Sequence, residues 1–202
     1  ISLLLNHFHP KHSPEFYCLL GRMYGIYLQD FEFGYELGRL GIQLMEALDM
    51  KEINCRVSVG FNWATRSYRE PLSASLDPLL EAHKMGIEMG DFLHACNSAI
   101  HRCQIAFMCG KELNWLKREL STLKVALKKS DYIIGSPQVE MLTKVVAILM
   151  EKRSTLSSGI NDQYESVTSS EFVYYEKSHF NYQKLVLQYL FEEYEAARET
   201  VF

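Results

Sequence analysis

The chain has 202 residues, of which 48% are hydrophobic and 23% are charged, and its formal net charge at pH 7 is −4. This is the composition of a globular protein with enough apolar material for a core, and without a dominant basic face it is not expected to bind nucleic acid. No run of about 18 apolar residues predicts a membrane span, and the apolar first residues follow no basic segment, so no signal peptide is expected.

The chain contains five cysteines, an odd number, and no two of them have CxxC spacing. They are Cys18, Cys55, Cys96, Cys103 and Cys109. All five fall inside apolar, helix-like patterns. We therefore expect reduced, buried thiols in a cytoplasmic protein rather than disulfides or a zinc site.

Residues 1–15 are predicted to be an N-terminal loop or linker. His7, His9 and His12 have a spacing that can chelate a metal, but no acidic or cysteine ligand stands beside them in a metal-site pattern, so we expect no metal here. The chain begins without Met and ends inside a predicted helix. We therefore expect it to be a piece of a longer protein.

Three helices are predicted next, at residues 16–28, 34–48 and 52–67. The first places large apolar residues on one side. These are Leu19, Leu20, Met23, Tyr24 and Tyr27. The second contains three glycines, each costing about 1 kcal/mol in a helix interior, a cost that close approach of another helix offsets. These are Gly34, Gly38 and Gly41. The third directs Val57, Gly60, Phe61 and Ala64 inward, with Trp63 as a packing aromatic.

Residues 61–110 contain the strongest helical signal. A helix over 72–89, kinked at Pro78, is predicted from apolar residues on one face; alternatively, Asp77 caps a helix that begins afresh. The predicted face is Leu72, Leu76, Leu79, Leu80, His83 and Ile87. The helix predicted at 92–108 is apolar around most of its circumference, which indicates neighbours on most sides.

The remaining residues predict further helices at 112–128, 137–153 and 172–191, and the start of another near residue 196. The first has a leucine stripe and a basic set, which is either a solvated face or a docking surface for an acidic partner. The basic set is Lys117, Arg118, Lys124 and Lys128. The serine-rich segment 154–170 is predicted to be a mobile loop.

Predicted helix ends recur near residues 28, 67, 108, 149 and 190, at intervals of about 40 residues, which is typical of stacked helical hairpins. We therefore predict an all-α, right-handed solenoid that forms a single domain over residues 16–202. Apolar residues of its last hairpin, Leu185, Leu190 and Val201, are expected to face water and to promote self-association.

Three stretches, YELGRLGIQLMEAL, WATRSYREPLSASLDPLLEAHKMGIEMGDFLHACNSA and LVLQYLFEEYEAARETV, resemble one family region. It is the tetratricopeptide-like region that follows the ATPase domain in large signalling proteins carrying serine/threonine kinase and sensor histidine kinase domains. The resemblance covers about residues 16–202 and includes Trp63 and Pro71 between hairpins. The sequence departs from the family's pattern at His94-Ala95-Cys96 and at Glu192-Glu193. The resemblance implies a cytoplasmic regulatory scaffold between catalytic modules.

No GxxxxGK[ST], GxGxxG, GxSxG or HExxH motif occurs in the sequence. Asp91, His94 and His101 share roughly one face of a predicted helix, with Glu88 just before it. Either these side chains form a pocket for a metal or an acid–base pair, or the two histidines only pack between helices. The sequence thus predicts a non-catalytic scaffold for protein–protein or interdomain contacts, without a cofactor. The alternative is an all-α ligand-sensing or enzymatic domain with a pocket near His94 and His101.

Overall fold

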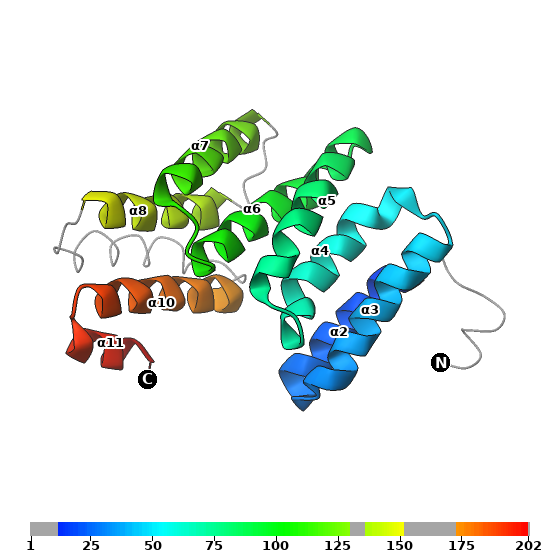
Figure 1. The fold of residues 1–202 in the computed structure, drawn as a ribbon, viewed down its shortest axis with the longest axis horizontal. Coiled ribbons are helices and arrows are strands. Elements are labelled where there is room, and N and C mark those ends of the chain that lie inside the picture. The colour runs from blue at the N-terminus through cyan, green and yellow to red at the C-terminus, as the bar shows by residue number, and fades with distance from the viewer. Residues whose placement is uncertain (1–11, 130–135, 152–172, 202) are drawn as a thin grey trace. The chain divides into compact units, whose positions relative to one another are not determined.

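The computed structural model describes residues 12–129, 136–151 and 173–201 (Figure 1). Within these ranges the chain is helical and contains no strand, which confirms the predicted all-α class. The helices belong to two compact units, Ile1–Lys111 and Glu112–Phe202. In the described part of the chain no helix has the length and apolar character needed to cross a membrane. The predicted serine-rich loop at 154–170 lies outside the described residues.

The first unit consists of five α-helices and three short 3-10 helices in its described part. They are α2 (Ser13–Leu28), α3 (Phe31–Ala47), η1 (Lys51–Ile53), α4 (Asn54–Ala64), η2 (Arg66–Tyr68), η3 (Leu72–Ser75), α5 (Leu76–Glu88) and α6 (Phe92–Met108). Helix α2 starts earlier than the predicted end of the N-terminal loop at residue 15, because Pro14 occupies its first turn, where proline is well tolerated. The predicted helix at 52–67 is α4 with a 3-10 helix at either end.

Helices α2 and α3 pack through glycines. A Cβ on Gly21 would collide with the backbone of Gly34, and one on Gly41 would lie 2.6 Å from the Pro14 carbonyl oxygen. The sequence prediction that the α3 glycines admit a close neighbour is therefore confirmed: the neighbour of Gly34 and Gly41 is α2, and that of Gly38 is the pair of side chains Phe61 and Thr65. The buried side of α2 also carries its own glycines, so the two backbones meet with few side chains between them.

The large apolar side of α2 does not face this contact. Tyr17, Cys18, Gly21 and Gly25 are buried, whereas most of the large residues predicted to share one side are exposed. The core lies under the opposite side of α2, where Cys18 meets residues from α3, η1 and α4. This cluster is Cys18, Met45, Ile53, Val57 and Phe61. Helix α4 packs against α2 and α3 before it and against α5 and α6 after it.

The predicted face of α5 is partly wrong. Only Leu79 of that face is fully buried, and Leu72 and Ile87 are exposed. The buried line is instead Ser75, Leu79, Ala82 and Gly86. Small residues line it because α6 comes so close that a Cβ on Gly86 would meet Ala95 Cβ at 2.8 Å.

The segment predicted to kink at Pro78, or to begin afresh with Asp77 as its cap, instead changes helix type at Leu76, and Asp77 lies inside the second helix. The segment starts as the 3-10 helix η3 and continues as α5, with Pro78 in the first turn of α5, where its missing N–H is tolerated. Helix α6 is buried around its circumference, as predicted for a helix with neighbours on most sides. Its buried residues are Ala95, Cys96, Ser98, Ile100, His101, Cys103, Gln104, Ile105 and Ala106.

In its described part, the second unit contains α7 (Leu113–Lys129), α8 (Ser136–Glu151), α10 (Val173–Leu190) and α11 (Tyr194–Val201). The predicted leucine stripe of α7 is buried against a valine-rich face of α8. The buried side chains are Leu116, Leu120, Leu123 and Leu127 on α7, and Val139, Leu142, Val145 and Val146 on α8. Helices α10 and α11 pack together, and Thr200 Oγ1 donates to Gln188 Oε1 at 2.8 Å.

Within the residues that the structure describes, four helices end in the same way. After each, a residue with positive φ follows the helix, and these residues are Asp49, Gly90, Gly110 and Glu192. The next N–H bonds back to the carbonyl five residues earlier, as Asp91 does to Gly86 at 2.8 Å. This is the Schellman motif, which satisfies the last carbonyls of a helix and turns the chain sharply.

Candidate functional site

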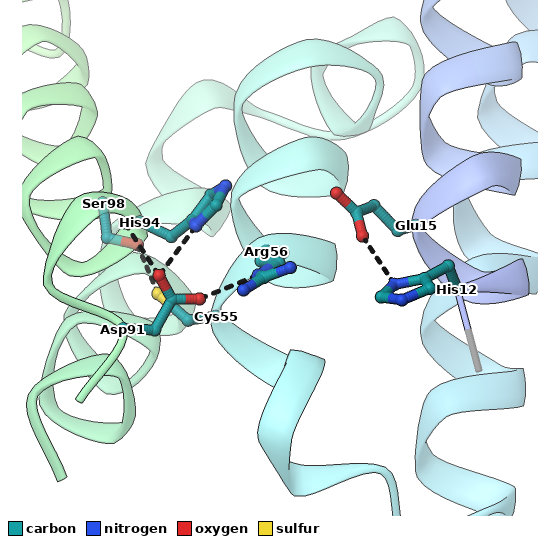
Figure 2. A network of polar contacts seen from close by, with 7 residues as sticks. All are labelled: His12, Glu15, Cys55, Arg56, Asp91, His94 and Ser98. Carbon is teal, nitrogen blue, oxygen red and sulfur yellow. Dashed lines mark hydrogen bonds and ion pairs between the residues drawn. The ribbon is translucent and has the colours of Figure 1, made fainter. Parts of the chain in front are cut away.

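Asp91 joins three helical segments at one turn (Figure 2). It follows the left-handed Gly90 at the end of α5 and caps the N-terminus of α6, where its Oδ1 accepts from the His94 N–H at 3.4 Å. The same oxygen lies 2.9 Å from His94 Nδ1, and Oδ2 accepts from Arg56 Nε of α4 at 2.9 Å. Asp91 is therefore both a helix cap and an ionic link between α4 and the α5–α6 turn.

The charge on Asp91 is stabilised by these partners. Burial raises the pKa of its carboxyl, but the hydrogen bonds from Arg56 and His94 lower the pKa by more than burial raises it. The pKa of Asp91 therefore lies below its ordinary value. Its side chain is only 12% exposed, compared with 36% for Arg56. The network holds a carboxylate where water screens it little.

Cys55 lies beside this network, and it is not an activated nucleophile (Figure 2). Its Sγ is 3.7 Å from Ser98 Oγ, and burial raises the pKa of the thiol to about 11. A thiol with that pKa is protonated at neutral pH, whereas a reactive cysteine needs a lowered pKa. The Asp91 carboxylate is placed to orient the His94 imidazole, but it also accepts a hydrogen bond from Arg56 and caps α6.

The four predicted pocket residues do not form one site. Asp91 and His94 are in contact, but His101 lies two turns further along α6. There its ring stacks on Trp63 at 4.0 Å, and its Nδ1 lies 3.0 Å from Gln104 Oε1. Glu88, at the end of α5, is exposed. Trp63 is thus a packing aromatic, as the sequence predicted, and His101 is a buried packing histidine.

The described residues contain no group of three or more His, Cys, Asp or Glu side chains placed to hold a metal ion. Of the predicted histidine set, His7 and His9 lie outside the described residues. His12 precedes α2, and its Nδ1 is 3.5 Å from Glu15 Oε2 (Figure 2).

A second polar network, around η2, was not predicted from the sequence. Arg66 donates through Nε and Nη2 to Glu70 Oε2 at 2.9 and 2.8 Å, and Tyr35 Oη donates to Glu70 Oε1 at 2.9 Å. Arg69 pairs with Glu32 of α3. These contacts fasten η2 to α3, and the spacing of Arg66 and Glu70 was the only local signal of them.

The basic residues of α7 have different roles. Lys117, Arg118 and Lys128 are exposed, whereas Lys124 is half-buried and donates to Glu140 Oε2 of α8 at 2.8 Å. Lys117, Lys124 and Lys128 follow at steps of seven and four, so they share one side of α7. Lys124 thus links α7 to α8, and its neighbours on this side present free charge at the surface.

The networks around Asp91, Glu70 and Lys124 all connect neighbouring helices. A comparison with protein-family models, with curated proteins and with solved structures found no match to this chain. The function is therefore inferred from how the helices are joined and from which surfaces they leave exposed.

Proposed function

We propose that the chain is a non-catalytic scaffold of stacked helical hairpins that mediates protein–protein or interdomain contacts. The packing of α4 supports this, because α4 contacts α2 and α3 before it and α5 and α6 after it. In a stack of hairpins, a helix contacts its own partner and the helices of the adjacent hairpins. The polar networks described above serve these same contacts between neighbouring helices.

The spacing of the left-handed turns is the observation that carries the proposal. Gly90 follows Asp49 by 41 residues (90 − 49), and Glu192 follows Gly110 by 82 (192 − 110), which is twice 41. Unrelated helices have no reason to end with the same backbone geometry at multiples of one interval. The interval supports a unit of about 40 residues, in the range of helical-hairpin repeats, and we propose a right-handed solenoid.

The proposed setting follows from the family resemblance. We propose that the chain belongs to a cytoplasmic, multidomain signal-transduction protein with ATPase and kinase modules, and that it positions those modules. Its partners are then proteins, and neither nucleic acids nor membranes. Lys117 and Lys128 offer accessible charge on one side of α7, beside exposed Arg118, and the chemistry they fit is an acidic protein surface.

Cross-linking tests this function. The protein is isolated from its natural source with its partners, treated with an amine-reactive cross-linker and analysed by mass spectrometry. We expect links from Lys117 and Lys128 to residues outside this chain's 202 positions. Lys84, which pairs with Glu81 on the exposed side of α5, is the control lysine. Links from the α7 lysines confined to this chain would contradict the proposal.

The alternative, a ligand-sensing or enzymatic domain near His94 and His101, has less support. Asp91 is engaged by Arg56 as well as by His94, and the His101 ring is stacked on Trp63. Saturable binding of a small ligand that His101→Ala abolishes, while the helical content stays unchanged, would favour this alternative.

A further inference from the structure

Ser121 is an exposed residue on the basic side of α7. The line of residues on this side follows at steps of four, three and four and consists of Lys117, Ser121, Lys124 and Lys128. Residues at these steps lie on one side of a helix. A serine hydroxyl is therefore placed in the middle of the surface to which the proposed function assigns an acidic partner.

The sequence before Ser121 is of the kind that a basophilic protein kinase recognises. Exposed Arg118 stands three residues before Ser121, and Lys117 precedes it. Kinases select substrates by the pattern of charge around the acceptor hydroxyl, and a carboxylate in the kinase groove can bind a guanidinium through two parallel hydrogen bonds. Of the arginines in the sequence, Arg118 alone has a serine or threonine three residues after it.

We propose that Ser121 is a phosphorylation site for a serine/threonine kinase that selects this arginine. In the reaction, Ser121 Oγ attacks the γ-phosphorus of ATP, and the bond from that phosphorus to the ADP oxygen breaks. The hydroxyl proton passes to a base of the kinase, and ADP leaves. The product is a phosphoserine on the basic side of α7.

The kinase groove takes the residues around the hydroxyl as an extended segment, so α7 opens locally at Ser121. Hydroxyl groups already compete with the helix there. Ser121 Oγ donates to the Lys117 carbonyl oxygen at 2.7 Å, and Thr122 Oγ1 donates to that of Arg118 at 3.2 Å. Such bonds slightly destabilise a helix and often bend it. In the described part of its unit, α7 packs mainly on α8, and a helix with few neighbours opens at a lower cost.

A phosphate on Ser121 cancels the charge of this surface. Residues 117–125 carry three positive side chains and one negative, a net charge of +2, and a phosphate adds about −1.5 to −2 at pH 7. Lys117 and Lys124 are within one turn of Ser121, where they can pair with the phosphate oxygens. Phosphorylation therefore releases an acidic partner from α7. This regulation rests on the scaffold function proposed above, whereas the site itself does not.

Phosphorylation in vitro tests the site. The 202-residue chain is incubated with ATP, Mg²⁺ and the catalytic domain of a calmodulin-dependent protein kinase, which selects arginine at this position, and mass spectrometry locates the phosphate. We expect phosphoserine at position 121. Arg118→Ala should slow its formation at least about tenfold, because the bidentate contact is lost. Lys117→Ala is the matched control, because it removes the same charge from the neighbouring position, and it should slow the reaction no more than about twofold.

Thr122→Ala should leave the phosphorylation unchanged, and Ser121→Ala should abolish it. Circular dichroism verifies that each variant remains folded. Absence of phosphate from Ser121, or an equal loss of rate in Arg118→Ala and Lys117→Ala, would overturn the proposal.

Cross-linking of the phosphorylated and the phosphatase-treated protein, isolated with its partners, tests the regulation. Lys128 is seven residues from Ser121, so a phosphate there leaves the Lys128 amine accessible. Links from Lys128 to residues outside the chain should fall at least about fivefold on phosphorylation, because the charge complementarity is lost. Equal links in both forms would overturn the regulation and leave the scaffold function standing. Their absence from both forms would contradict the scaffold function and the regulation, whereas the kinase assay would still decide the site.

Discussion

Gly21 of α2 and Gly34 of α3 are in backbone-to-backbone contact, and no space remains for a side chain at Gly21. A Cβ there would meet the Gly34 carbonyl oxygen and would lie 3.1 Å from the Gly38 nitrogen. Neither atom can move without shifting α3. The first hairpin is therefore held at a separation that only glycine permits.

Replacing Gly21 with alanine should destabilise the protein by about 2 kcal/mol. The overpacking is against backbone and outweighs the gain of about 1 kcal/mol that alanine brings to a helix. Gly60→Ala is the matched control, because its Cβ would meet only side-chain atoms of Cys18, with Cβ at 3.0 Å and Sγ at 3.9 Å, and no backbone. Urea unfolding gives the free energy of unfolding of both variants, provided that its dependence on urea concentration stays the same as in the wild type. Equal losses of stability in the two variants would contradict this account of the α2–α3 contact.

Asp91 and Asp30 provide a second comparison, because both cap a helix through a carboxylate that accepts the N–H three residues on. Asp30→Ala should cost about 1 kcal/mol, the usual value of an N-cap. Asp91→Ala should cost about 1 kcal/mol more, since it also leaves Arg56 and His94 without their carboxylate. Thermal and urea denaturation of the two variants decide between these values. An equal loss would mean that the Arg56 link contributes nothing to stability.

The same carboxylate makes the fold sensitive to acid. Because the pKa of Asp91 is lower in the folded chain than its ordinary value of 3.8, its ionic contribution is fully present above that value. The contribution is lost as the pH falls through the lower, folded-state pKa. Asp91→Asn should therefore be less stable than wild type at neutral pH, and the difference should shrink below about pH 4. A difference independent of pH would contradict this prediction.

The cysteines should differ in reactivity. Burial, with a smaller contribution from Glu15, raises the pKa of Cys18 to about 12, and burial raises that of Cys55 to about 11. Cys109, by contrast, is half-exposed. Brief treatment with iodoacetamide at neutral pH should modify Cys109 first and leave Cys18 and Cys55 intact until urea unfolds the chain. Mass spectrometry locates the label, and early alkylation of Cys55 would be inconsistent with the packing around α4.

Apolar periodicity predicted the helices of this chain, but it did not always predict which side of each helix is buried. The α7 stripe around Leu116 and Leu120 was predicted, because leucines dominate one side and charges the others. On α2 the large residues point away from the core, since the glycines allow a closer and more extensive contact on the opposite side. Periodicity measures hydrophobicity and gives little weight to the absence of a side chain, which decides the packing here.

The candidate site was predictable only where its residues are close in sequence. Asp91 and His94 are three residues apart and meet at the α6 N-terminus, as helix geometry requires. Arg56 approaches Asp91 from another helix, 35 positions earlier. The stacking of His101 on Trp63 likewise depends on how α4 packs against α6. Such contacts follow from tertiary packing, and no local pattern encodes them.

Native-state hydrogen exchange, followed by mass spectrometry, tests the proposed stack of hairpins most directly. In a stack, each hairpin is stabilised mainly by its neighbours, so opening free energies should differ from one hairpin to the next. We predict that α10 and α11 exchange through an opening that leaves α4, α5 and α6 protected, with the slowest exchange in α4 and α6. Exchange of all described helices through one common opening, at a single free energy, would contradict the repeat architecture and the scaffold function proposed from it.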